Sequence, residues 1–371
     1  MDSEKRRKKI LFFVPLPPPV HGASLRSKSL VESKLINDAF NIEVIRLNFA
    51  VETDDVGKFS VGKVVKSARK AFGIIYKMIT FKPDLVYFVF AVYGFALYRD
   101  LMYGCIFKLF SPKVLYHLRT QGVKSQIERS KFKRGIFRYV FKNTRVICLS
   151  EFLSRDIADV YPIRPMVINN GIEDVTHGLL LKKQRNTIVE ILFLSNFAKT
   201  KGVEELIKAF AILKSKNYKF IGLIVGGPVD LTIDNLQVMI DAHDLGDDVK
   251  IMGPKYGDDK HEILNHADIF VLPTYFEAFP GSILEAMQFG LPVVSTFEGA
   301  IPEIVDDGQT GLLVNKQSPV ELAQKMELLI NSPDLRLALG ASGRTKFIEN
   351  YTLAIFERKM KEAFDEVLHG D

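Results

Sequence analysis

Short apolar runs alternate with longer amphipathic stretches along the whole chain. In the first half the apolar runs cover 10–14, 42–47, 85–89, 114–118, 145–148 and 166–169. Stretches with helical periodicity lie between the earlier runs, at 23–36, 62–79 and 93–110. Continuous apolar strands joined by helices are typical of a parallel sheet that is covered on both faces. The first half is therefore predicted to be a doubly wound α/β domain.

The pattern breaks around 170–187 and then starts again. New strands are predicted at 188–195, 220–225, 249–252, from 269 and at 311–314, with helices at 203–215, 233–243, 260–267, 319–331, 334–350 and 353–368. A chain of 371 residues is long for one hydrophobic core. We predict two Rossmann-like domains, 1–175 and 176–352, that face a cleft, followed by a C-terminal helix at 353–371.

Composition and the N-terminus narrow the class of protein. The chain is 47% apolar and 25% charged, which is typical of a globular protein. A basic N-terminus leads into a short apolar run that prolines interrupt at once, unlike a secretory signal. The longest uncharged stretch, 85–98, has 14 residues, whereas a membrane span needs about 20. A cytoplasmic protein without a spanning helix is predicted.

Charge is unevenly distributed between the two halves. Residues 1–180 carry 30 Lys and Arg against 16 Asp and Glu, a balance of +14, and the remainder carries −8. A basic run at 124–145 has aromatic and aliphatic residues between its cations. It is either a solvated helix face or a contact with an anionic membrane. No recognition motif accompanies it, so nucleic-acid binding is not expected.

The segment 269–296, IFVLPTYFEAFPGSILEAMQFGLPVVST, carries the most specific chemistry. It predicts a strand, a loop with Glu277, a helix with Glu285, and another strand. Backbone N–H groups at 281–283 have no helical partners at a helix start and suit a phosphate. Glu285 can then bind both hydroxyls of a ribose, and Glu277 can face a sugar. Alternatively, Ser282 and Glu285 form a capping box.

Three further positions are candidates for ligand contact. Gly22 lies in the loop PLPPPVHGAS after the first strand, where His21 is a weaker candidate. Lys201 precedes Gly202 at a helix start, where an ammonium group can reach a diphosphate. His117 ends a strand and so faces the ligand edge of the sheet. Each also has an ordinary structural interpretation, as a turn, a surface lysine and a buried histidine.

The segment 269–296 resembles the signature of the retaining family 4 glycosyltransferases, two glutamates with seven residues between, in enzymes of the GT-B fold. The resemblance implies that Glu277 contacts the donor sugar and that Glu285 holds the ribose. It also implies that the loop of Phe279, Pro280, Gly281 and Ser282 meets the sugar and the diphosphate. Pro280 has no N–H and offers only shape and a carbonyl. In this fold the last helix often crosses back to the first domain.

The same resemblance assigns roles outside that segment. It implies that Lys201 contacts the diphosphate, that His117 contacts the donor sugar, that the Gly22 loop lies at the donor, and that Pro254 lines the nucleobase pocket. The family usually has an arginine five positions before the lysine. Here that position is Asn196, which is uncharged, so phosphate neutralisation depends on Lys201.

The predicted activity is transfer of a sugar, with retention, from a UDP- or GDP-sugar to a carbohydrate or lipid-linked acceptor in cell-surface polysaccharide or glycolipid synthesis. The catalytic residues are expected to be Glu277, His117 and Lys201. No cofactor and no metal are expected. Two alternatives remain: a sugar-nucleotide epimerase of the same fold, and a non-catalytic membrane-associated binding protein, which the Asn196 substitution suggests.

Overall fold

The computed structural model describes residues 7–18, 22–47, 61–110, 113–176 and 188–370. The chain divides into two compact units. Unit 1 comprises Met1–Gly171 and Ala354–Asp371, and unit 2 comprises Ile172–Leu353. His21 and most of the predicted linker, 177–187, lie outside the described residues.

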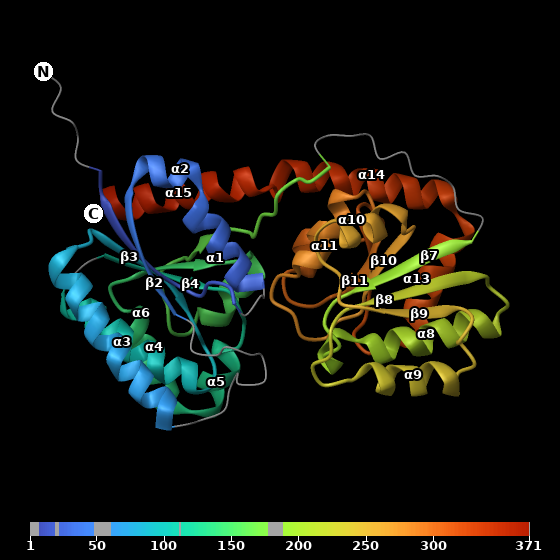
Figure 1. The fold of residues 1–371 in the computed structure, drawn as a ribbon, viewed down its shortest axis with the longest axis horizontal. Helices are drawn as coiled ribbons and strands as arrows, with labels where there is room; N and C mark the ends of the chain where they lie inside the picture. Colours follow the sequence, from blue (N-terminus) through green and yellow to red (C-terminus); the bar gives the residue numbers. More distant parts are fainter. Residues whose placement is uncertain (1–6, 19–21, 48–60, 111–112, 177–187, 371) are drawn as a thin grey trace, which may run out of the picture. The chain divides into compact units, whose positions relative to one another are not determined.

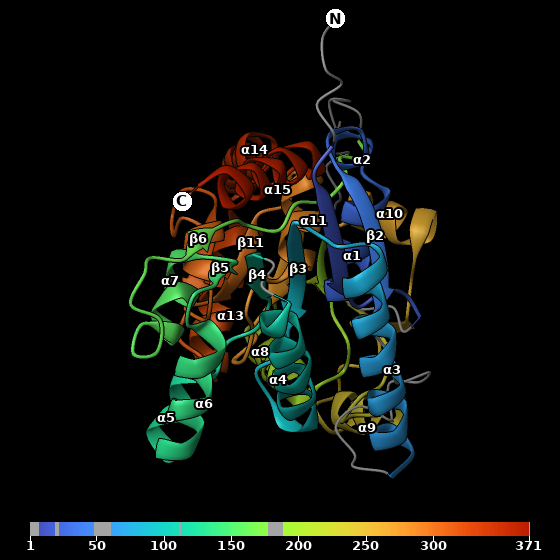
Figure 2. The same cartoon turned by 90° about the vertical axis from the view of Figure 1, so that its left-hand side faces the viewer.

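Unit 1 contains a parallel sheet of six strands in the order β2-β1-β3-β4-β5-β6. Its strands are β1 (Lys9–Val14), β2 (Asn41–Arg46), β3 (Leu85–Phe90), β4 (Lys113–Leu118), β5 (Arg145–Cys148) and β6 (Met166–Val167). Its helices are α1 (Gly22–Glu32), α2 (Lys34–Ala39), α3 (Val61–Thr80), α4 (Gly94–Leu109), α5 (Val123–Arg129), α6 (Lys131–Phe141), α7 (Glu151–Ser154) and most of α15 (Leu353–His369). Helices α3 and α4 cover one face of this sheet and α15 the other (Figure 2).

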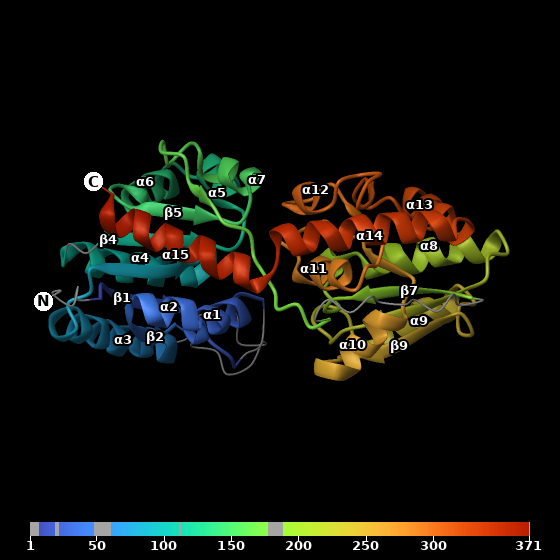
Figure 3. The ribbon, with the colours of Figure 1, turned by 90° about the horizontal axis from the view of Figure 1, so that it is seen from above.

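The C-terminal helix α15 is part of the core of unit 1, and Figure 3 shows it lying across the strands. The Phe364 ring packs 5.6 Å from the Phe12 ring and 5.4 Å from the Tyr87 ring, centroid to centroid. Glu366 pairs with Arg145 at 2.8 Å near the end of the helix. The helix therefore supplies apolar surface that the strands of the first half require for burial.

One predicted helix of unit 1 is wrong. The stretch 23–36 does not form a continuous helix, because α1 ends at Glu32 and α2 begins at Lys34. Ser33, between them, has an extended backbone and its hydroxyl accepts a hydrogen bond from the Ile36 N–H at 3.4 Å. Serine at an N-cap satisfies backbone donors that a new helix leaves open, which favours a break over continuation.

Unit 2 contains a second parallel sheet, in the order β12-β11-β10-β7-β8-β9. Its strands are β7 (Val189–Leu194), β8 (Phe220–Val225), β9 (Val249–Gly253), β10 (Ile269–Leu272), β11 (Val293–Thr296) and β12 (Gly311–Val314). Its helices are α8 (Val203–Ser215), α9 (Ile233–Ala242), α10 (Gly257–His266), α11 (Gly281–Gln288), α12 (Ile301–Ile304), α13 (Pro319–Asn331) and α14 (Pro333–Asn350). Figure 1 shows α8 and α9 on one face and α10, α11 and α14 on the other.

Both sheets are doubly wound, which confirms the predicted fold class of each unit. Counted from β7, the order in unit 2 is 3-2-1-4-5-6, the arrangement of dinucleotide-binding domains. In that arrangement ligands bind beyond the carboxyl ends of the strands where the order reverses. The reversal lies between β7 and β10, so a ligand-binding site is expected there. Among the described residues, no helix is long and apolar enough to cross a membrane.

Candidate active site

Two loops meet at the reversal point of the sheet in unit 2. The first, 195–202, follows β7, and the second, 273–280, follows β10. The carbonyl of Thr200 accepts hydrogen bonds from the Tyr275 N–H and from the Thr274 hydroxyl, both at 2.9 Å. Gly202 allows this close contact because it has φ +76° and a Cβ there would lie 2.1 Å from the Pro273 carbonyl oxygen. The two loops are thus joined backbone to backbone.

Lys201 and Glu277 are brought together by these two loops, although 76 residues separate them. Lys201 ends a 3-10 turn (Lys199–Lys201) before α8, and its ammonium group pairs with the Glu277 carboxylate. Their side chains are only 23% and 18% exposed, so the pair is partly desolvated and still open to a ligand. A lysine and a carboxylate side by side suit a substrate that has an anionic group next to polar hydroxyls.

Gly299 holds the loop that carries Glu277. It has φ +55°, and a Cβ at this position would lie 2.0 Å from the Glu277 carbonyl oxygen. Beside it, the Ala300 N–H donates to the Ala278 carbonyl at 3.0 Å. The Glu277 carboxylate itself accepts from the Ala278 N–H at 3.1 Å. The backbone of Glu277 is therefore set by a contact that only glycine permits.

Glu285 lies on α11, and the capping-box alternative for it is wrong. The helix begins at Gly281 with Pro280 as its N-cap residue, and no side chain caps it. Glu285 is therefore the fifth helical residue, too far along to cap the first turn. Its carboxylate instead pairs with the Lys260 ammonium group on α10 at 2.8 Å, and both side chains are about a quarter exposed. Gly281 and Ser282 are half-buried at the start of the helix.

The remaining predicted donor residues have varied surroundings. Phe279 is buried, with its ring 6.1 Å from that of Tyr351, and Pro280 is buried beside it. Asn196 and Pro254 are exposed, after β7 and β9 respectively. Gly22, in unit 1, is exposed at the first position of α1. The structure thus brings Lys201 to Glu277, and it pairs Glu285 with a residue the sequence did not indicate.

His117 belongs to unit 1, where it is fully buried near the carboxyl end of β4. Its Nδ1 lies 2.7 Å from the hydroxyl of Tyr87 on β3. The Arg119 guanidinium reaches the same hydroxyl, with Nη2 at 3.3 Å. Burial, and secondarily the charge of Arg119, hold the pKa of His117 well below its usual range. The imidazole is therefore neutral at physiological pH.

This neutral histidine predicts a specific acid sensitivity. The unfolded chain protonates His117 near pH 6.5, about its ordinary value, whereas the folded chain does so only at lower pH. The unfolded state then binds more protons, so stability falls as pH drops below about 6.5, by at most about 1.4 kcal/mol per pH unit for this group. Urea unfolding of the wild type should lose more stability on acidification than that of His117→Gln. Equal losses would contradict the prediction.

Two residues that contact predicted site residues were not themselves predicted: Lys260, beside Glu285, and Tyr87, beside His117. Lys260 precedes Glu285 by 25 residues on another helix, and no local spacing indicates the pair. Tyr87 had a usable signal, because Val89 is the partner of His117 in the β3–β4 register. A residue two positions earlier points to the same face of a sheet, so Tyr87 is a diagonal neighbour of His117. The described part of the chain holds no group of three or more potential metal-ligating side chains.

Comparison with known proteins agrees with this fold. Residues 181–346 match the family of glycosyl transferases group 1. The chain is 30% identical over 245 residues to an uncharacterized glycosyltransferase of Methanocaldococcus jannaschii, covering 65% of this chain and 66% of that protein. It is 30% identical over 202 residues to the capsular polysaccharide biosynthesis glycosyltransferase CapM of Staphylococcus aureus, covering 54% of this chain and 50% of CapM.

A solved structure extends the likeness of fold over nearly the whole chain. Anabaena HepE in complex with UDP has a TM-score of 0.73 and 17% identity, covering 97% of this chain and all of that one. The chain thus spans between half and two thirds of the length of the two curated relatives and nearly all of this structural neighbour. The fold is that of the GT-B glycosyltransferases. Residues 181–346 thus match the group 1 glycosyltransferases, in agreement with the resemblance noted in the sequence.

Proposed function

We propose that this chain is a retaining, metal-independent hexosyltransferase that moves a sugar from a UDP- or GDP-sugar to a carbohydrate or lipid-linked acceptor. The observation that carries the proposal is the Lys201–Glu277 pair at the reversal point of the sheet in unit 2. The relatives support the chemistry, since CapM acts in capsular polysaccharide biosynthesis and HepE was solved with UDP. Synthesis of a cell-surface polysaccharide or glycolipid is the corresponding role.

Each charged group of the site has a distinct task in this proposal. Breaking the bond between sugar and diphosphate leaves negative charge on the leaving group and positive charge on the sugar ring. Lys201 and the N–H groups of Gly281 and Ser282 stabilise the leaving diphosphate. Glu277 orients the donor sugar, and Glu285 binds the ribose hydroxyls. Because an ammonium group and backbone amides supply the positive field, the phosphate needs no metal ion.

The residues around this centre complete the donor site. Phe279 and Pro280 shape the sugar pocket, Pro254 lines the nucleobase pocket, and Asn196 donates a neutral hydrogen bond. Unit 1 takes the acceptor and contributes Gly22, in its first loop, to donor binding, and His117 donates a hydrogen bond to a substrate oxygen. An epimerase would share the donor site but need no acceptor, and a binding protein would lack turnover. The two curated relatives described above are named as glycosyltransferases, which favours transfer over both.

Nucleotide binding gives the first test. A thermal-shift series with UDP-, GDP- and ADP-sugars should show one preferred base, because stabilisation grows with ligand concentration relative to Kd. Glu285→Ala should weaken binding of the preferred nucleotide by about tenfold, the effect of about 1.4 kcal/mol of lost hydrogen bonding. Glu262→Ala, an acidic change on α10 away from the pair, is the control. Absence of binding by every nucleotide sugar would reject the proposed function.

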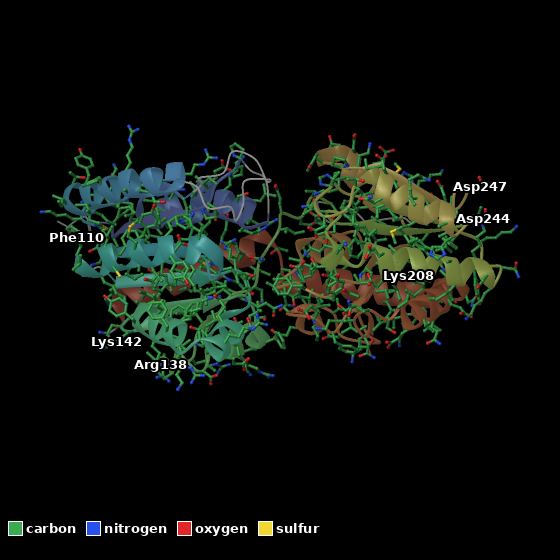
Figure 4. The ribbon with its side chains drawn as sticks, turned by 90° about the horizontal axis from the view of Figure 1, so that it is seen from below. Phe110, Arg138, Lys142, Lys208, Asp244 and Asp247 are labelled. Carbon is green, nitrogen blue, oxygen red and sulfur yellow. The ribbon has the colours of Figure 1, made fainter. Side chains whose placement is uncertain are left out.

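Peripheral membrane contact is the second part of the proposal, and α6 with the end of α4 supports it. Leu109 is 80%, Phe132 72% and Tyr139 55% exposed, which is unusual for large apolar side chains. The Lys108 ammonium group lies over the Tyr139 ring, 4.9 Å from its centroid. Figure 4 shows Phe110, Arg138 and Lys142 along the same side of unit 1. Exposed aromatic rings among cations suit the surface of an anionic membrane.

Vesicle binding tests this surface directly. We expect the protein to sediment with phosphatidylserine-containing vesicles at low salt and to be released as salt shortens the range of attraction. Replacing Arg138 and Lys142 by glutamine should weaken binding by about tenfold or more, since each cation near the surface contributes about 1 kcal/mol. The matched control is Lys208→Gln with Lys250→Gln, exposed lysines of unit 2. Equal binding by the two double variants would exclude this surface.

A further inference from the structure

A chain of hydrogen bonds in unit 1 links Arg119, Tyr87 and His117. The guanidinium Nη2 of Arg119 lies 3.3 Å from the Tyr87 hydroxyl, and that hydroxyl lies 2.7 Å from Nδ1 of His117. Tyr87 and His117 are fully buried, on neighbouring strands β3 and β4. The cluster lies at the carboxyl end of β4, the edge of a doubly wound sheet at which ligands bind.

The direction of each proton in this chain follows from the donors present. Arginine can only donate, so the Tyr87 oxygen accepts from Arg119. The tyrosine proton then goes to Nδ1 of His117, the acceptor at 2.7 Å. A neutral imidazole that accepts at Nδ1 carries its proton at Nε2. Burial and the Arg119 charge lower the pKa of His117 and keep the ring neutral, in agreement with this tautomer.

Three donor groups of the cluster remain without a partner in the described part of the chain. They are Nε2–H of His117 and Nε–H and Nη1–H of Arg119, and all three nitrogens are shielded from solvent. No acidic side chain among the described residues forms an ion pair with Arg119. Buried donors without acceptors are costly and rare, and a guanidinium without a counter-charge more so. The cluster presents donors and a positive charge, and therefore suits an oxyanion.

We propose that His117 and Arg119 form an oxyanion-binding site for an acidic group, phosphate or carboxylate, on the acceptor substrate. Tyr87 is a positioning residue that fixes the histidine tautomer and one arm of the guanidinium. This inference rests on the proposed function, because it assigns a substrate class to the acceptor unit. The balance of +14 over residues 1–180 favours such a substrate, since it attracts acidic molecules. A water molecule would fit less well, because the surrounding groups are donors and would leave its two O–H groups without acceptors.

Anion binding by the full chain tests the proposal. Titrations of inorganic phosphate and, separately, of glucuronate are followed by calorimetry with the preferred nucleotide, UDP or GDP, at saturation, so that the donor site of unit 2 is occupied. Binding of phosphate alone indicates a phosphorylated acceptor, and binding of glucuronate alone indicates a uronate acceptor. Arg119→Gln should lower the affinity for the anion by at least about tenfold, because it removes a charge-assisted hydrogen bond. Arg164→Gln, which removes an exposed guanidinium of the same unit, should not.

In the titrations, the inference is overturned by no binding of either anion to the wild type, or by equal affinity in wild type and Arg119→Gln. Failure of every nucleotide sugar to bind would instead reject the proposed function, and the anion titration can then be repeated without a nucleotide. If Arg119→Gln does not fold, the anion titration of the wild type still tests the inference. The ¹⁵N signals of the His117 ring should show a proton on Nε2 and should shift when the anion is added. A proton on Nδ1, or no shift, would exclude the site.

Discussion

Replacing Lys201 by alanine is expected to lower kcat by about 10²- to 10³-fold, the loss usual when one preorganised donor to a developing oxyanion is removed. The reason is the position of the ammonium group, beside Glu277 at the reversal point of the sheet. In the proposed reaction negative charge grows on the diphosphate as the sugar leaves, so the lysine should contribute more in the transition state than in the ground state. Affinity for a nucleoside monophosphate should change much less. Steady-state kinetics and a monophosphate titration measure the two effects.

The matched control is Lys199→Ala, in the same 3-10 turn. Lys199 is exposed, and its backbone N–H, which the substitution retains, donates to Asp230 at 3.1 Å. This variant removes the same charge from nearly the same place but not from the pair with Glu277. A kcat for Lys201→Ala equal to that of Lys199→Ala would contradict the role of Lys201. A loss confined to monophosphate affinity would indicate ground-state binding only.

Gly299→Ala is expected to reduce turnover by about 10²-fold although residue 299 needs no contact with substrate. The reason is that a shift of about 1 Å at a catalytic group, the role proposed for Glu277, has an effect of this size. The added Cβ would lie 2.0 Å from the Glu277 carbonyl oxygen and 3.1 Å from that of Ala278. Both neighbours are backbone atoms, so the loop itself must move. The carboxylate of Glu277 then leaves its position beside Lys201. Kinetics and thermal unfolding of the same preparation measure both consequences.

The control Gly308→Ala separates the effect of the steric clash at residue 299 from the stability cost of placing alanine in a left-handed backbone conformation. Gly308 also has positive φ, +77°, but a Cβ there would meet no atom within 4 Å. This control should cost about 1–2 kcal/mol of stability, the usual penalty for alanine in a left-handed conformation, and leave turnover unchanged. Gly299→Ala should cost more than that. Equal stability and equal turnover of the two variants would show that the Glu277 loop tolerates the clash.

Much of the fold was predictable because the buried strands are continuous apolar runs. Strands such as 85–90 and 269–272 are buried at every position and have no helical alternative at that length. The helices of 123–141 were not delimited, since their basic surface masks the apolar stripe of Phe137, Val140 and Phe141. The break at Ser33 depends on a single cap, which the helical periodicity around it conceals.

The candidate site was predictable to the extent that its chemistry is local. Glu277 and the start of α11 lie within one strand-loop-helix segment, so their proximity follows from chain order. The contact of Lys201 with Glu277 depends on β7 and β10 being neighbours, which the order of strands along the chain does not reveal. The pairs of Lys260 with Glu285 and of Tyr87 with His117 likewise arise from tertiary packing.

The placement of α15 has a consequence for biosynthesis. Phe12 leaves the ribosome long before Phe364, whose ring covers it. Unit 2 is one uninterrupted stretch, 172–353, and so can complete its folding while translation continues. Unit 1 must wait until α15 emerges, and until then Phe12 and Tyr87 lack the cover of Phe364. A premature stop codon a few residues before 364 would therefore damage a sheet whose strands were synthesised long before it.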